Sequence, residues 1–76
     1  MGSLNFVASD VLSYLNHLKR YGCRGQTSGE IKFHFWGVIS ERSIESQLER
    51  LKKGKYVREV KLKYKNKEII LYEPND

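Results

Sequence analysis

The sequence predicts a small α+β domain with three helices and a small antiparallel sheet, in the order helix, strand, helix, helix, strand, strand. Two observations predict this class. Apolar residues recur at helical spacing through the first two thirds of the chain, whereas lysine alternates with other residues after Gly54. Because 39% of the 76 residues are hydrophobic, the chain can form one compact core, and we expect a single domain over residues 1–76.

The first helix is expected over residues 9–21. Ser9 is a favourable N-cap, and Asp10 places a negative charge in the first turn, where the helix dipole favours it. Gly22 suits the left-handed position that often follows the end of a helix. The apolar stripe of this helix consists of Val11, Leu12, Leu15 and Leu18.

The second helix is expected over residues 28–36, before Gly37. Thr27 and Glu30 have the spacing of a capping box, in which each side chain bonds the backbone amide of the other residue. We expect the aromatic residues of this segment in the core, because so small a domain needs its large apolar groups inside. The alternative is that they stack on unpaired bases. These residues are Phe33, Phe35 and Trp36.

The third helix is expected over residues 41–53, with Ser40 as its N-cap. Ile44, Leu48 and Leu51 recur at helical spacing and form one narrow apolar stripe. The face opposite this stripe has no large apolar group, which is typical of a surface open to solvent or to a polar partner. It consists of Arg42, Ser46, Glu49 and Lys53, with Ser43 and Arg50 on one flank.

A β-hairpin is expected over residues 56–73, with Asn66-Lys67 as its two-residue turn. This register places apolar pairs on one side of the sheet and an ion pair on the other, which supports it. We expect Leu48 of the third helix to pack against the first helix and against the apolar side of the sheet. The facing pairs are then Tyr64 with Ile69, Leu62 with Leu71, Lys65 with Glu68, and Lys63 with Ile70.

The second strand of this hairpin is apolar on both faces, as a central strand would be. A short third strand is therefore expected on its far edge, from the residues just before Thr27. Ile70 and Tyr72 share a side with the lysines. Either the lysine stems cover these two residues, or the residues bind a partner or a second copy of the chain.

Positive charge is concentrated at the end of the third helix and in the hairpin. Nine Lys and Arg residues and one acidic residue lie between Arg50 and Lys67, a local net charge of +8 against +5 for the whole chain. Such asymmetry is typical of proteins that bind a nucleic acid or an anionic surface. The alternative is the solvated surface of a Lys/Glu-rich protein, of the kind found in thermophiles.

Several classes of function lack support in the sequence. No apolar stretch approaches the length of a membrane span, so we expect no membrane partner and a cytoplasmic location. The spacing of Cys23 from His17 and His34 matches no zinc pattern, so neither a metal nor another cofactor is expected. Nor does a nucleophile–base set or a phosphate-binding glycine loop occur, so we do not expect an enzyme.

The order of elements resembles the winged helix-turn-helix family, and the resemblance covers the chain from Ser9 to Tyr72. The size and the Lys/Glu/Tyr-rich composition further resemble small regulators carried by viruses and plasmids of hot-living archaea. The segments that carry the resemblance are Thr27-Ser28-Gly29-Glu30-Ile31, Gly37-Val38-Ile39-Ser40, the stripe Ile44, Leu48 and Leu51, and Gly54-Lys55-Tyr56-Val57.

The resemblance implies that the third helix enters the major groove of double-stranded DNA, while the hairpin wing contacts the backbone or an adjacent minor groove. Glu41, Glu45 and Glu49 would repel phosphates and restrict this docking, and we expect Glu45 to face sideways, toward the rest of the domain. The implied DNA contacts are Arg42, Ser43, Ser46, Gln47, Arg50 and Lys53 on the helix, Lys61, Lys63, Lys65, Asn66 and Lys67 on the wing, and Thr27 and Ser28 at the start of the second helix.

The function expected from these patterns is binding of double-stranded DNA and regulation of transcription. The alternatives are a winged-helix module that binds proteins and an RNA-binding domain that uses the same basic hairpin. If the chain forms a homodimer, we expect contact through the first helix or through a face of the hairpin.

Overall fold

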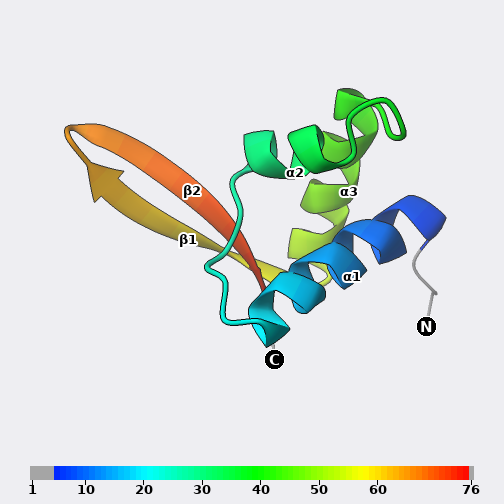
Figure 1. Ribbon diagram of the computed structural model, residues 1–76, viewed down its shortest axis with the longest axis horizontal. Helices are drawn as coiled ribbons and strands as arrows, with labels where there is room; N and C mark the ends of the chain where they lie inside the picture. Colours follow the sequence, from blue (N-terminus) through cyan, green and yellow to red (C-terminus); the bar gives the residue numbers. More distant parts are fainter. Residues whose placement is uncertain (1–4, 76) are drawn as a thin grey trace.

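Three helices surround one apolar cluster, and a two-stranded hairpin extends away from it (Figure 1). The computed structural model describes residues 5–75, so residues 1–4 and 76 of the predicted domain lie outside the described part. Its elements confirm the predicted α+β class, with three helices and a small antiparallel sheet. They are α1 (Phe6–Arg20), α2 (Ser28–His34), α3 (Glu41–Lys53), β1 (Val57–Tyr64) and β2 (Lys67–Pro74).

Helix α1 begins one turn before the predicted start at Ser9. Its N-cap is Asn5, whose side chain accepts a hydrogen bond of 2.7 Å from the backbone amide of Ala8. The earlier start is favoured because it adds Ala8, which is fully buried, to the apolar stripe. The predicted end is confirmed: Gly22 is left-handed, with φ of +78°, and the amide of Cys23 donates to the carbonyl of Leu18 at 2.9 Å.

Helix α2 has the predicted capping box but ends at His34, two residues before the predicted end. The hydroxyl of Thr27 accepts from the amide of Glu30 at 3.1 Å, and the Glu30 carboxylate accepts from the amide of Thr27 at 2.9 Å. A turn follows, in which the amide of Val38 donates to the carbonyl of Phe35 at 2.9 Å. Gly37 is left-handed, with φ of +81°, and its position permits this turn.

The prediction that all three aromatic residues of this segment are buried is wrong. Phe33 is 80% exposed and Trp36 is 70% exposed, whereas Phe35 is half-buried and packs on the core. The reason for the exposure of Phe33 is helical spacing. Ile31 and Phe35 are four residues apart and share the inward face, whereas Phe33 lies two residues beyond Ile31 and so points to the opposite side.

Helix α3 matches its prediction closely. Ser40 caps it by accepting from the amide of Ser43 at 3.2 Å, and the predicted stripe of Ile44, Leu48 and Leu51 is buried. The residue after α3, Gly54, has ordinary right-handed φ of −80°. Glycine is favoured at this position because the ring of Tyr56 lies close to it: a Cβ on Gly54 would be 3.0 Å from that ring.

The core joins all three helices to the base of the hairpin. From the sheet, Val57 and the half-buried Tyr72 pack on the helices, and both lie on the face that also carries the lysines of β1. Leu62 and Tyr64 lie on the other face and are 48% and 60% exposed. The prediction that Leu48 packs against their side is therefore wrong. The core consists of Ala8, Val11, Leu15, Ile31, Ile44, Leu48, Leu51 and Val57, with Leu71 also buried.

The hairpin is confirmed, but its register differs from the predicted one by two residues. The turn is Lys65-Asn66, both left-handed with φ of 48° and 66°, so that Tyr64 faces Lys67. Asn66 tolerates a left-handed turn position in either register, so the turn alone does not select between them. Contacts at the base decide, where Val57 faces Pro74 and both are buried. Because the shift is even, each side chain keeps its predicted face.

The predicted third strand is reduced to a single bridge. Gln26 and Tyr72 exchange backbone hydrogen bonds of 3.1 and 2.7 Å. The pairing cannot extend forward, because Thr27 caps α2. The chain runs close to β2 there, since a Cβ on Gly25 would come within 2.6 Å of the side chain of Glu73.

Within residues 5–75, no helix is both long and apolar enough to cross a membrane. The thiol of Cys23 is free and exposed. In the same part of the chain, no group of three or more His, Cys, Asp or Glu side chains is arranged to hold a metal ion.

Candidate nucleic-acid interface

The solvent face of α3 carries the charged and small residues that the sequence predicts there. Arg42, Ser46, Arg50 and Lys53 are all exposed, on the side opposite the buried stripe. The face thus combines three cations with the exposed Glu49 and one small residue. A small residue lets another surface approach the helix closely.

Two other predicted contacts on α3 are already engaged within the protein. Gln47 is half-buried, and its side-chain oxygen accepts a hydrogen bond of 3.1 Å from the side chain of Asn5. The hydroxyl of Ser43 lies 3.0 Å from that of Ser40, within the N-terminal cap. Both residues therefore lie on a flank of α3, and both would have to exchange an internal bond for a bond to a ligand.

One acidic residue of α3, Glu45, lies on the opposite flank, toward α2. Glu45 forms an ion pair of 2.5 Å with Lys32 of α2, which confirms that it faces sideways. The hydrogen bond between the two raises the pKa of Lys32 and lowers that of Glu45. Glu49 lies 3.8 Å from Lys52 on the same helix. Both carboxylates are thus partly neutralised, but only Glu45 is turned toward α2, whereas Glu49 stays on the exposed polar face with Arg42 and Lys53.

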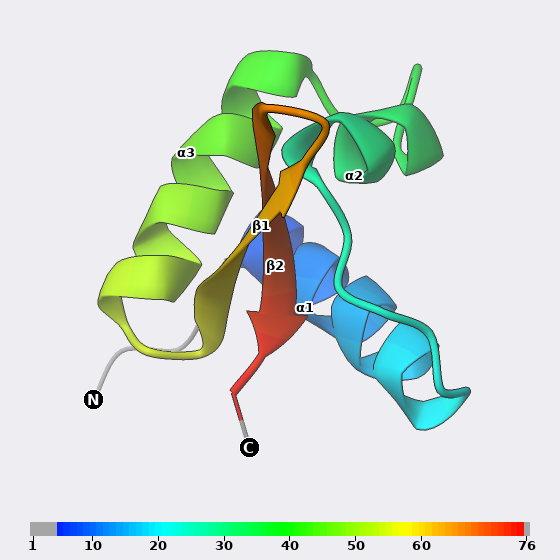
Figure 2. The same cartoon turned by 90° about the vertical axis from the view of Figure 1, so that its left-hand side faces the viewer.

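The outer half of the hairpin is open to solvent on both faces. Every residue from 61 to 68 is exposed, including all four predicted lysines and Asn66 at the turn. Figure 2, seen from the hairpin side, shows α3 on one side of the hairpin and α2 on the other. The lysine nearest the tip, Lys65, holds its ammonium group 5.4 Å above the ring of Tyr64.

One carboxylate joins the hairpin to α3. Glu59 of β1 accepts from Lys52 of α3 at 3.3 Å and from the hydroxyl of Tyr72 at 3.5 Å. The hydrogen bond to Glu59 raises the pKa of Lys52, and burial together with Glu59 raises that of Tyr72. Because alternate residues of a strand share a face, Lys61 and Lys63 continue outward from Glu59 on the same side of the sheet. The lysine row therefore begins beside α3.

Among the described residues, acidic side chains pair with four cations, two of them, Lys52 and Arg58, in α3 and the hairpin, and leave most cations of these two elements unpaired. Ion pairs join Arg24 to Glu30 at 2.8 Å and Arg58 to Glu73 at 2.9 Å, in addition to the pairs of Lys32 and Lys52. Over residues 5–75, seven cations of α3 and the hairpin belong to no such pair, so their positive field remains open to an anion. They are Arg42, Arg50, Lys53, Lys61, Lys63, Lys65 and Lys67.

The start of α2 is a poorer anion site than the sequence suggests. Thr27 uses both its hydroxyl and its amide in the capping box, and Ser28 beside it is half-buried. The box also brings the Glu30 carboxylate to this helix end. A hydrogen bond from Arg24 and another from the amide of Thr27 lower the pKa of Glu30 to about 2, so it is negatively charged at neutral pH.

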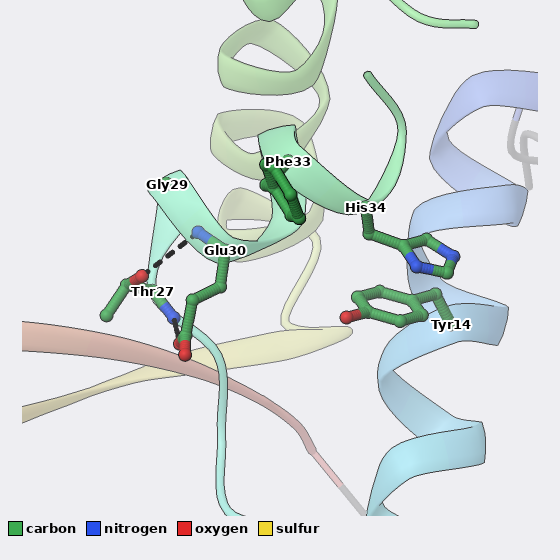
Figure 3. A pocket seen from close by; sticks show the side chains of 6 residues that line it. All are labelled: Tyr14, Thr27, Gly29, Glu30, Phe33 and His34. Carbon is green, nitrogen blue, oxygen red and sulfur yellow. Dashed lines mark hydrogen bonds between the residues drawn. The ribbon is translucent and has the colours of Figure 1, made fainter. Parts of the chain in front are cut away.

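Sequence reasoning missed a concave surface between α1 and α2 (Figure 3). Its volume is about 700 Å³. The rings of Tyr14 and His34 stack there with centroids 3.8 Å apart, and exposed Phe33 stands beside them. The spacing of Phe33 from Ile31 was the one available signal, because residues two apart cannot share a helix face. The lining residues are Tyr14, Thr27, Gly29, Glu30, Phe33 and His34.

Comparison of the chain with known protein families, with curated proteins and with solved structures gives no match.

Proposed function

We propose that this chain is a winged helix-turn-helix protein that binds double-stranded DNA and regulates transcription. The element order supports the assignment: a capped short helix, a turn, a helix with a polar outer face, and a basic hairpin. The bridge between Gln26 and Tyr72 adds support, because it stands in place of the short strand that the predicted order requires.

In this proposal α3 lies in the major groove. Its 13 residues make a rod about 20 Å long, and a groove about 12 Å wide admits a helix. Arg42 and Arg50 then reach base edges, where an arginine can bind guanine through two hydrogen bonds. Ser46 between them allows the helix to approach the bases. Gln47 contributes less than the sequence suggests, because Asn5 already holds its amide.

The hairpin holds the backbone in the same proposal. Its eight-residue strands reach about 25 Å, far enough to extend from the groove that holds α3 to neighbouring phosphates. Lys61 and Lys63 point to the side on which Glu59 meets α3, and Lys65 and Lys67 surround the tip. Contacts of this kind position a protein on DNA without reading its sequence.

The observation that carries the proposal is the group of seven cations without ion-pair partners. They lie on two elements that Glu59 and Lys52 hold together, whereas four other cations are each joined to a carboxylate. An isolated basic helix or hairpin could be a solubilising surface. Two unneutralised basic surfaces held side by side favour a ligand with regularly spaced negative charges.

The test is the salt dependence of binding to a random-sequence duplex, measured by fluorescence anisotropy. If the seven cations neutralise about five to seven phosphates, log K falls against log[salt] with a slope of about −4.5 to −6. Lys63→Ala/Lys65→Ala should make that slope shallower by about 1 for each lysine. Arg20→Ala is the matched control, because Arg20 is exposed at the end of α1. A slope near zero for the wild-type protein would exclude phosphate binding.

Competition with structured RNA of equal length tests the RNA-binding alternative. In the proposed function the duplex DNA wins this competition. The protein-binding alternative has one specific observation in its favour, the exposed aromatic residues of α2 and the turn that follows.

A further inference from the structure

Three large apolar side chains remain outside the core at one end of the molecule. Phe33 on α2, together with Trp36 and Val38 in the following turn, are all at least 70% exposed. A backbone hydrogen bond fixes the turn between the first two, because the amide of Trp36 donates to the carbonyl of Phe33 at 3.1 Å. Clustered apolar groups of this size on a small domain mark an interaction surface, and tryptophan is the residue that most often dominates one.

A groove suited to an aromatic ring adjoins this cluster. Phe33 forms one wall, and the stacked pair of Tyr14 and His34 forms another (Figure 3). At about 700 Å³ it lies in the size range of ordinary ligand pockets. The Glu30 carboxylate and the hydroxyl of Tyr14 provide acceptors for an indole N–H. The surface therefore has an exposed tryptophan and, adjoining it, an open groove lined by aromatic rings.

Charge selects which partner can use this surface. Residues 1–49 contain five Lys and Arg and five Asp and Glu, a net charge of zero, whereas residues 50–67 carry +8. Two copies of the chain repel each other if their hairpins meet, but they do not if their α2 ends meet. A nucleic acid has the opposite preference, because the cations that would attract it lie on α3 and the hairpin.

We propose that the surface formed by Phe33, Trp36, Val38 and the adjoining groove binds a second copy of this chain. A two-fold axis near Phe33 brings the two phenyl rings together and places Trp36 of each copy in the groove of the other. A two-fold contact needs such a self-complementary surface. The interface differs from α1 or the hairpin, where the sequence predicts a dimer. It leaves both basic surfaces open and, given the proposed function, would present them together to a two-fold symmetric site.

The single tryptophan of the chain provides a direct test. Its exposed indole becomes buried on dimerisation, so its fluorescence emission should shift to shorter wavelength as protein concentration rises from about 1 μM to 1 mM. Sedimentation equilibrium over the same range should show the mass rising from 8.9 kDa toward twice that value. A mass that stays at that of one chain at 1 mM, with unshifted emission, would overturn the proposal.

Substitutions locate the interface. Phe33→Glu should weaken dimerisation at least about thirty-fold, as loss of a central aromatic anchor does. Tyr21→Ala, at a similarly exposed aromatic residue that caps the C-terminus of α1, should not. Circular dichroism confirms that both variants fold. If Leu62→Glu on the hairpin abolishes the dimer while Phe33→Glu leaves it intact, the interface lies elsewhere and the proposal fails.

A change in tryptophan emission produced only by single-stranded DNA would likewise overturn the proposal, in favour of base stacking. Duplex binding by monomeric Phe33→Glu is measured separately, so failure of the dimer does not decide the proposed function.

Discussion

The helical body and the outer half of the hairpin differ in what they do with apolar and charged residues. The body, which consists of the three helices and the base of the hairpin, buries eight aliphatic side chains in one cluster. Ion pairs join its elements. The outer hairpin, residues 61–68, buries none of its residues, and within the described part of the chain its four lysines form no ion pairs. Stability therefore resides in the body, whereas the outer hairpin contributes positive charge with little burial, so a substitution in the outer hairpin should change the charge with little effect on stability.

The largest expected effect is loss of stability in the body. Leu48→Ala should lower the free energy of unfolding by about 2–5 kcal/mol, because it leaves a cavity among buried residues of α3 and α1. Leu62→Ala, the same substitution on the half-exposed hairpin face, should cost less than about 1 kcal/mol. Urea denaturation of both variants measures the difference. Equal losses would mean that the outer hairpin is packed against the body, and the comparison would fail.

The next effect separates sequence reading from backbone holding. Arg42→Ala should weaken binding to the preferred duplex by about 1–3 kcal/mol and binding to random duplex by less, because only a base contact distinguishes the two. Lys63→Ala/Lys65→Ala should weaken both by similar amounts. Anisotropy titrations on a selected and a random duplex provide the values. If the Lys63→Ala/Lys65→Ala variant lost its sequence preference and the Arg42→Ala variant kept it, the roles assigned to α3 and the hairpin would be reversed.

Acid should destabilise the body through its capping box. The pKa of Glu30 is lowered from 4.5 to about 2 in the folded chain, so its contribution to stability is complete above about pH 4.5 and is lost as the pH falls toward 2. The wild-type protein should therefore lose more stability between these values than Glu30→Gln does. Melting temperatures at several pH values from 2 to 6 test this. Identical pH profiles would show that the Arg24–Glu30 pair does not stabilise the fold.

The smallest effect concerns two lysines with left-handed backbone. Lys55 lies at the junction of α3 and β1 with φ of 64°, and Lys65 lies in the hairpin turn with φ of 48°. Glycine adopts this conformation without the cost that a Cβ brings. Lys55→Gly should stabilise the whole fold by about 0.5–1 kcal/mol, whereas Lys65→Gly should change only local opening of the hairpin tip. Thermal unfolding and amide hydrogen exchange distinguish global from local effects, and a reversed pattern would contradict the separation of the two regions.

Local patterns predicted the features that depend on neighbouring residues in the chain. The capping box of Thr27 and Glu30, the cap at Ser40 and the stripe on α3 all appear as predicted. The start of α1 was missed because Asn5 and Ser9 are both good caps, and burial of Ala8 decided between them. For the candidate site, the sequence predicted which residues carry charge, but it could not show that Asn5 already binds Gln47.

By itself, the sequence determined the three helices, the caps at Thr27 and Ser40, the hairpin, the division of its side chains between two faces, and the concentration of positive charge. Only the tertiary structure decided which hairpin face meets the helices, because both faces carry apolar residues and, of these, Val57 and Tyr72 pack on the core cluster. It also decided the register and the exposure of Phe33 and Trp36. The physical reason is range: caps and periodicity depend on hydrogen bonds within a few residues, whereas burial depends on surfaces that meet only when distant segments pack.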